Sequence, residues 1–358
     1  MNPNLFSPLK LREITLKNRI VVSPMCQYSA VDGFPNDWHF VHLGSRAVGG
    51  AGLIFTEAVA ISPEGRISPA DLGIWKDEHI APLKRITDFI HENGSFAGIQ
   101  LAHAGYKSSS EEPWNGRNYI KPENGGWEVF SPSEVVLADG KSIASVITTE
   151  GIKKVLEDSK QAVIRALKAG FKVIEIHAAH GYLVHEFMSP LVNKRTDEYG
   201  GSYENRIRLL LQIVDDTRLI IPEELPLFVR ISATDWLENG WTIDDSIKLS
   251  TILKEKGVDL VDCSSGGLTP PEKIPVGFGY QVPFAQSIRE KTGMMTGAVG
   301  MIFSPQQAEE IIASGKADLV FLAREMLRDP YFPMRAAYEL GYDTPWAKQY
   351  DRAKRVKK

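Results

Sequence analysis

The sequence predicts an α/β fold, a TIM (β/α)₈ barrel, on three observations. A short β-branched apolar run followed by a glycine or polar turn recurs eight times along the 358 residues. An amphipathic helical pattern separates most successive runs. The runs are apolar at both parities, which is typical of strands buried on both faces of a parallel sheet. Eight such strands are the number that closes a barrel.

The predicted strands occupy residues 20–25, 52–60, 96–102, 173–178, 227–231, 260–264, 294–299 and 318–323. The predicted helices lie near 78–92, 150–169, 204–219, 243–256, 281–291 and 305–314. In 150–169 the apolar residues share one face, and Thr149 and Gly170 suit its start and its end. Ser304 and Pro305 are typical of a helix cap and a first helical position.

An open, doubly wound sheet is the structural alternative to the barrel. Such sheets often carry a GxGxxG turn after the first strand, and this sequence has none there. Its Gly49-Gly50-Ala51-Gly52 run precedes a strand, so we interpret it as a helix-to-strand turn. The barrel is therefore the favoured prediction.

One domain is predicted over residues 1–345, with an insertion at about 106–145. The insertion is rich in Ser, Glu, Pro, Gly and Trp and follows the third strand. Loops after barrel strands open on the active-site face, so it is either a lid or substrate wall, or a solvated excursion. Residues 346–358 are predicted to be a basic tail without an apolar face.

Composition and charge exclude several classes of partner. A formal net charge of -4 provides no general field for nucleic acid or anionic lipid. The chain has no apolar stretch long enough for a membrane span and no apolar signal region at its start. The two cysteines, Cys26 and Cys263, lie in different contexts and suit free thiols in a reducing compartment. We expect a cytoplasmic enzyme acting on small molecules.

The fourth strand runs into two histidines, His177 and His180, at the end where barrels carry their active sites. Two imidazoles at this spacing can donate hydrogen bonds to one oxygen that gains negative charge. A metal pair and two structural histidines remain as alternatives, although no HExxH set is present. Tyr182, two residues further on, is a candidate proton donor or a packing residue.

Other polar residues and glycines also mark the ends of predicted strands. Gly300, Ala323 and Arg324 follow strands seven and eight, where barrels often bind phosphate, although the glycine also suits a tight turn. Gln100 and Arg230 point inward and must be paired, either with each other or with a polar ligand. Cys26 follows the first strand, and an inert buried thiol is the simpler interpretation; Cys263 is assigned to the core.

Several segments together resemble the old yellow enzyme family. They are KNRIVVSPMCQYS, TEAVAISPEGR, GIQLAHAG, VIEIHAAHGYLVHEFMSPLVNKRTDEYGGSYENR, LFVRIS, VDLVDCSSGG, TGAVG and AREMLRDP. They are most similar to its xenobiotic-reductase, or thermophilic-like ene-reductase, subgroup. The similarity extends from about residue 5 to residue 352.

This resemblance implies a non-covalent FMN at the barrel mouth, reduced by NADPH or NADH. The flavin ring would meet the first, second, third and fifth strands, at Ser23, Pro24, Met25, Cys26, Ala58, Gln100 and Arg230. Its phosphate would meet Gly300, Ala323 and Arg324. The implied reaction is ping-pong: flavin N5 delivers hydride to the β-carbon of an activated alkene, and the α-carbon is protonated.

The resemblance also implies roles on the substrate side. His177 and His180 would bind the activating oxygen, Tyr28 would hold the same end of the ligand, and Tyr182 would donate the proton. Cys26 would tune the flavin. A homodimer or homotetramer is implied, in which the tail segment Tyr350-Asp351-Arg352 brings Arg352 to the neighbouring active site.

One departure is Tyr106-Lys107, where relatives carry Arg-Lys, which puts a cationic nicotinamide-phosphate contact there in doubt. Two other functions stay open on physical grounds. One is a metal-dependent hydrolase or aldolase that uses the histidine pair, and the other is a non-catalytic flavoprotein. No metal is expected.

Overall fold

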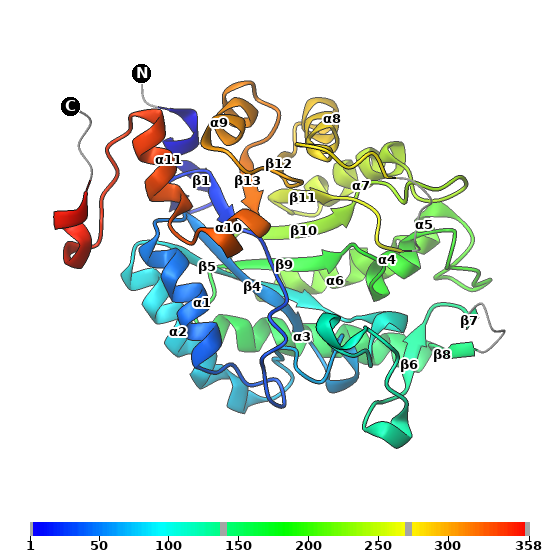
Figure 1. Cartoon of the computed structure of the whole chain (residues 1–358). Coiled ribbons are helices and arrows are strands. Elements are labelled where there is room, and N and C mark those ends of the chain that lie inside the picture. The colour runs from blue at the N-terminus through cyan, green and yellow to red at the C-terminus, as the bar shows by residue number, and fades with distance from the viewer. Residues whose placement is uncertain (1–2, 137–141, 269–273, 355–358) are drawn as a thin grey trace.

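Eight parallel strands close into a barrel in the computed structural model, which describes residues 3–136, 142–268 and 274–354 (Figure 1). The strands are β3 (Ile20–Val22), β4 (Leu53–Ala60), β5 (Phe96–Ala102), β9 (Val173–Ala178), β10 (Leu227–Ser232), β11 (Leu260–Ser264), β12 (Met295–Ala298) and β13 (Leu319–Leu322). The last strand pairs with the first, so the ring is complete. The barrel prediction is confirmed, and the open sheet is excluded.

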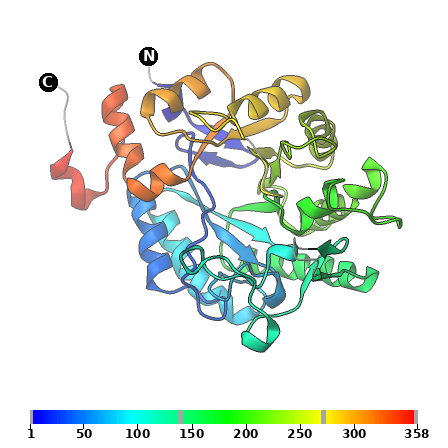
Figure 2. The same ribbon diagram turned by 45° about the vertical axis from the view of Figure 1, so that its right-hand side comes forward.

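Helices cover the outside of the ring, as Figures 1 and 2 show. The longer ones are α1 (Asp37–Val48), α2 (Ile80–Glu92), α3 (Thr149–Lys168), α6 (Arg208–Ile220), α7 (Ile243–Glu255), α8 (Val282–Thr292), α9 (Pro305–Ala313) and α11 (Phe332–Leu340). The short ones are α4 (Leu183–Met188), α5 (Tyr203–Arg206) and α10 (Arg324–Arg328). Turns of 3₁₀ helix occur at η1 (Asn4–Phe6), η2 (Pro63–Gly65), η3 (Asp77–His79), η4 (Gly105–Lys107), η5 (Pro113–Asn115), η6 (Pro122–Asn124) and η7 (Lys348–Ala353).

Two of the predicted helix caps can be checked directly. The Ser304 side chain accepts a hydrogen bond from the backbone N–H of Gln307, as expected for a cap before Pro305. The cap of α3 is Thr148, not Thr149, because Thr148 has the extended backbone that the cap position requires. The glycine run at 49–52 joins α1 to β4, which confirms the helix-to-strand turn.

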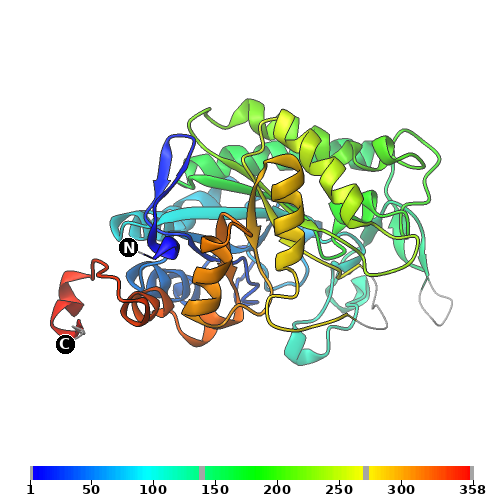
Figure 3. The same ribbon diagram turned by 90° about the horizontal axis from the view of Figure 1, so that it is seen from above.

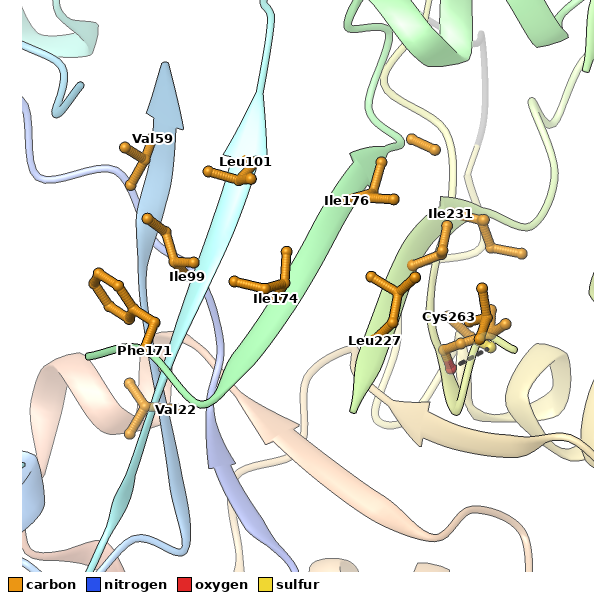
Figure 4. Packing of buried hydrophobic residues seen from close by; sticks show 14 of the residues in the cluster. Val22, Val59, Ile99, Leu101, Phe171, Ile174, Ile176, Leu227, Ile231 and Cys263 are labelled. Carbon is orange, nitrogen blue, oxygen red and sulfur yellow. Dashed lines mark hydrogen bonds between the residues drawn. The ribbon is translucent and has the colours of Figure 1, made fainter. Parts of the chain in front are cut away.

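Strand parity sorts the barrel residues into two apolar clusters. Val173, Phe228 and Leu260 belong to a cluster inside the ring, whereas their neighbours Ile174 and Val261 belong to the cluster under the helices. Figure 4 shows part of the latter, in which Ile99 and Leu101 of β5 lie beside Ile174 and Ile176 of β9. The strand residues that alternate with those in Figure 4 therefore line the barrel interior.

An N-terminal hairpin contributes to the amino-terminal end of the barrel. It consists of β1 (Leu9–Leu11) and β2 (Ile14–Leu16), paired antiparallel. Leu11 and Leu16 are buried and belong to the cluster inside the ring. The sequence pattern does not predict this hairpin, because its strands have only three residues each.

The predicted insertion contains a small sheet of β6 (Val129–Ser131), β7 (Val135–Val136) and β8 (Ser142–Val146), and its residues 137–141 lie outside the described part. The C-terminal tail extends away from the barrel in Figures 1 and 3 and contains η7. Trp346 and Tyr350 line a cavity of about 470 Å³ with Tyr331 and Met334. The tail therefore has an apolar face, contrary to prediction, and its residues 355–358 lie outside the described part.

Candidate active site at the carboxyl end of the barrel

The barrel interior becomes polar toward the carboxyl ends of the strands. Val173, Glu175 and His177 share one parity on β9, so apolar packing gives way along the strand to a carboxyl and then to an imidazole. Gln100 lies opposite Glu175 in the register, and Arg230 lies opposite His177. All three polar side chains beside Glu175 are almost fully buried. Sequence parity alone therefore places a polar layer at the mouth of the barrel.

Gln100 and Arg230 do not pair with each other. The Gln100 amide donates to Glu175 Oε1 at 2.7 Å, and Arg230 Nε lies 3.1 Å from Asp262 Oδ2. Arg230 Nη1 also donates to Ser23 Oγ at 3.3 Å. The sequence left open whether Gln100 and Arg230 pair with each other or with a polar ligand. The first alternative, pairing with each other, is wrong, because both side chains contact carboxyl groups on neighbouring strands.

Burial raises the pKa of both carboxyl groups in this layer. The pKa of Asp262 rises to about 6, opposed by the charge of Arg230. Burial raises the pKa of Glu175 well above its usual range, with Asp262 adding to the effect. The guanidinium of Arg230 can balance the charge of one ionised carboxyl group, so the layer holds no uncompensated buried charge when either Glu175 or Asp262 is protonated.

Three of the four predicted catalytic residues, His177, His180 and Tyr182, lie together beyond this layer, and the fourth, Cys26, lies on the segment after β3. The rings of His177 and His180 are 5.2 Å apart at 87°, and those of His177 and Tyr182 are 4.9 Å apart at 88°. His177 Nδ1 accepts a hydrogen bond from the backbone N–H of Ala179 at 3.2 Å, so its proton lies on Nε2. That N–H has no partner among the described residues and is available to a ligand.

Backbone hydrogen bonds hold the turn that carries His180. His180 and Gly181 both have left-handed backbones, with φ of 60° and 73°, which a histidine adopts at a cost of about 1–2 kcal/mol. The His180 N–H donates to Ser232 Oγ at 2.9 Å, and the Gly181 N–H donates to His185 Nδ1 at 2.9 Å. Lys107 Nζ donates to the His180 carbonyl at 2.8 Å. The surrounding elements thus maintain the strained turn.

The protonation states of these side chains suit hydrogen-bond donation. Burial and the charge of Arg230 keep the pKa of both His177 and His180 well below the usual value, so both imidazoles are neutral at pH 7. Burial raises the pKa of Tyr182 well above its usual range, so the phenol keeps its proton. The mouth therefore presents neutral hydrogen-bond donors at His177, His180 and Tyr182.

Cys26 and Tyr28 lie on the segment after β3. Glu57 Oε2 accepts the backbone N–H of Gln27 at 3.1 Å, and Glu57 Oε1 lies 3.2 Å from His39 Nε2. Burial, followed by the nearby carboxyls of Asp71 and Glu57, raises the pKa of Cys26 well above its usual value. Cys26 is therefore a thiol at neutral pH, and Cys263, buried in β11, matches its assignment to the core.

The residues predicted to hold a phosphate come together in one cavity. Gly300, Ala323 and Arg324 line a space of about 160 Å³ with Tyr280 and Gln281. Gly300 has a φ of 121°, and a Cβ there would lie 3.0 Å from Gln281 Nε2. The positive φ therefore favours glycine at this position, and a side chain there would also displace Gln281.

One predicted site residue, Arg352, lies away from the barrel mouth, and several residues at the mouth were not predicted. Arg352 is exposed on η7, in the tail that extends away from its own barrel, so a single chain does not bring it to the mouth. Trp114 of the insertion packs edge-on against Tyr28 at 5.8 Å, although its side chain is 67% exposed. Asp262, Ser232 and Ser264 were not predicted as site residues. Ser232 lies two residues after Arg230 on β10, and Asp262 and Ser264 lie two residues apart on β11, so strand alternation was the signal that could have found them.

Among the described residues, no helix is long and apolar enough to cross a membrane, and no group of three His, Cys, Asp or Glu side chains is placed to hold a metal ion. Enzymes built on (β/α)₈ barrels bind their ligands where the strands end, and the buried polar layer, the histidine pair and the Gly300 cavity all lie at that end of this barrel. The chain belongs to the NADH:flavin oxidoreductase / NADH oxidase family, whose description matches residues 4–343.

Close relatives and solved structures agree with this assignment. The NADPH dehydrogenase of Bacillus subtilis (strain 168) is 48% identical over 354 residues, 98% of this chain and 99% of that protein. An NADPH dehydrogenase of Halalkalibacterium halodurans is also 48% identical, over 99% of both chains. Morphinone reductase in complex with tetrahydroNAD superposes with a TM-score of 0.78 at 27% identity, over 96% of this chain and 93% of that one.

A complex of 2-naphthoyl-CoA reductase superposes with a TM-score of 0.85 at 24% identity, covering 94% of this chain. This chain spans 52% of that longer protein, and the likeness concerns the fold alone. The resemblance to the old yellow enzyme family is confirmed. The protein is an FMN-dependent oxidoreductase that uses NAD(P)H, and the hydrolase and aldolase alternative is wrong.

The mouth of the barrel fits FMN in two respects. The glycine-lined cavity with Arg324 suits a phosphate group, because guanidinium and close backbone approach both favour that anion. The amide of Gln100 and the guanidinium of Arg230 supply buried polar groups where a flavin ring would need them.

Proposed function

We propose that the protein reduces activated C=C bonds of α,β-unsaturated aldehydes and ketones, and that nitro compounds and quinones are further substrates. The observation that carries the proposal is the neutral histidine pair above the polar layer. His177 Nε2–H is unpartnered among the described residues, and the ring of His180 lies beside it at 5.2 Å. Two such donors suit one carbonyl oxygen that becomes an enolate oxygen.

Each residue would have a separate task in this reaction. Ser23–Cys26, the residues of the polar layer and those of the phosphate cavity would hold FMN, which would supply the hydride. His177 and His180 bind the activating oxygen and stabilise its growing negative charge. Tyr28 holds the same end of the ligand. Tyr182, whose phenol stays protonated, gives the proton to the α-carbon.

The contacts of the insertion support its proposed role as a wall of the substrate site. Trp114 contacts Tyr28, and the positive charge of Arg117 opposes the rise in the pKa of both Tyr28 and Tyr182. The two residues stand at the tip of a loop closed by the antiparallel bridge between Ser110 and Tyr119. We propose that this tip covers one side of the ligand, which favours the wall over a solvated excursion. Two unpaired cysteines support a reducing, cytoplasmic setting.

The experiment that tests the proposal separates the two half-reactions. His177→Ala and His180→Ala should each slow enone reduction by an amount equivalent to about 2–4 kcal/mol, because each removes one oxyanion donor. Flavin reduction by NADPH should change much less. His91→Ala, which removes an imidazole on α2, is the control. Unchanged enone kinetics in the His177/His180 double variant would exclude this role for the pair.

A further inference from the structure

We propose that Ser264 is a positioning residue that fixes the tautomer of His180, so that the proton of this imidazole lies on Nδ1 and faces the substrate. Ser264 ends β11 and is buried. Its Oγ lies 2.7 Å from His180 Nε2. The inference rests on the proposed function only in its last step, the identity of the group that His180 contacts.

The distances around Ser264 Oγ indicate whether Ser264 or His180 is the donor in this hydrogen bond. If His180 Nε2 carried the proton, the Ser264 hydroxyl would donate to its other neighbour, Gln281 Oε1, which is 3.4 Å away. That oxygen already accepts a much shorter bond from Ser265 Oγ, at 2.6 Å. A contact of 3.4 Å is weak for a hydroxyl donor, whereas 2.7 Å is an ordinary strong bond. The Ser264 hydroxyl therefore donates to His180 Nε2.

The neutral His180 ring therefore has one N–H group that it can offer to a ligand. A neutral ring with an accepting Nε2 has its proton on Nδ1. Nδ1 of His180 has no protein partner among the described residues, which matches the unpartnered Nε2–H of His177. The two imidazoles thus use opposite ring nitrogens to present two N–H groups to one ligand. Without Ser264, His180 would be free to carry the proton on Nε2 and to present a lone pair instead.

The main chain of His180 is held without Ser264. Ser232 accepts the His180 N–H, and Lys107 donates to the His180 carbonyl. Ser232 itself donates to the Gly266 carbonyl at 2.7 Å. Removing the Ser264 hydroxyl should consequently alter the proton position on the ring and leave the turn in place.

The test uses the FMN-bound enzyme with ¹⁵N-labelled histidine and one phenol probe, 4-hydroxybenzaldehyde. The His180 signal, assigned by its loss in His180→Gln, should show a protonated Nδ1 and an unprotonated Nε2. Ser264→Ala should shift it toward the Nε2-protonated form and weaken phenol binding roughly three- to tenfold, as for one hydrogen bond. Ser264→Thr, which keeps a hydroxyl, should restore both.

Cys263→Ala is the matched control, because this neighbour of Ser264 in β11 contacts the Val261 carbonyl and not His180 or Gln281. It should leave the His180 signal and phenol affinity unchanged. A wild-type signal with the proton on Nε2, or one that Ser264→Ala does not alter, would overturn the inference. If the tautomer depends on Ser264 but His180→Ala reduces enones normally, the proposed function fails and the tautomer assignment stands.

Discussion

Cys26 lies half-buried at the mouth, beside two carboxyl groups that oppose its ionisation. A thiol that keeps its proton is a poor nucleophile, because the thiolate is the reactive form. Burial, followed by the charges of Asp71 and Glu57, raises the pKa of Cys26 and therefore favours a thiol that contacts the flavin over one that forms a covalent intermediate with substrate.

We accordingly expect Cys26→Ala to remain active while the reduction potential of the bound FMN shifts. Spectroelectrochemical titration of the holoenzyme gives the potential, and steady-state turnover gives the activity. Cys263→Ala, which changes the buried cysteine of β11, is the control. Complete loss of turnover with FMN still bound would indicate covalent chemistry at Cys26.

Asp71 makes stability depend on pH. Burial, with Glu57 adding to the effect, raises the pKa of Asp71 to about 7. Between about pH 4 and 7 the folded protein keeps a proton that the unfolded chain has released, so this group lowers stability as pH rises. The difference in Tm between Asp71→Asn and wild type should change across this window in favour of the variant. The surface variant Asp77→Asn should show a flat difference, and a flat difference for Asp71→Asn would contradict the assignment.

At the level of elements, the two ends of the barrel have separate tasks. The N-terminal hairpin packs Leu11 and Leu16 into the cluster inside the ring, far along the strands from the histidine pair. In barrels of this kind the amino-terminal end serves stability and the carboxyl end serves chemistry. Mutations in the hairpin should therefore affect unfolding and leave turnover intact.

Leu16→Ala tests this division. Leu16 is fully buried, so the substitution should lower the free energy of unfolding by about 2–5 kcal/mol, through lost burial and the cavity left behind. Urea unfolding measures the loss, and kcat and KM for an enone at a temperature below the transition should match wild type. Thr15→Ala, on the exposed side of the same strand, controls for the hairpin. A large change in kcat with little change in stability would contradict this account.

The regular elements could be predicted because strand and helix periodicities are local. Every predicted strand was found, and so were the caps at Ser304 and the glycine turn before β4. The hairpin of β1 and β2 was missed because three-residue strands give too little pattern. The partners of Gln100 and Arg230 were missed because register between strands is non-local, and sequence parity does not say which carboxyl lies opposite which amide or guanidinium.

For the molecule as a whole, the tail and the active site lie apart within one chain. The ring of Tyr350 lies 6.2 Å from that of Tyr331 in the same chain, tilted by 60°, and Arg352 is exposed. In this arrangement Arg352 lies away from its own barrel mouth, so the predicted contact is with the mouth of another copy. The shared site in a homodimer or homotetramer therefore stays a prediction, and it depends on assembly.

Deleting residues 350–358 should raise KM for enones and leave FMN binding largely intact, because the proposed contact is to the ligand of the neighbouring subunit. Deleting only 355–358 keeps the Tyr350-Asp351-Arg352 segment and should leave KM unchanged. Sedimentation at the assay concentration gives the oligomeric state in parallel. A monomer with full activity would rule the shared site out.

The central claim is that this barrel passes hydride from NADPH, through bound FMN, to an activated alkene. The most direct measurement is an anaerobic titration of the purified holoenzyme followed through the visible flavin absorbance. NADPH should bleach the flavin band, and 2-cyclohexenone added afterwards should restore it with formation of cyclohexanone. A flavin that NADPH reduces but that 2-cyclohexenone and other enones leave bleached would contradict the claim.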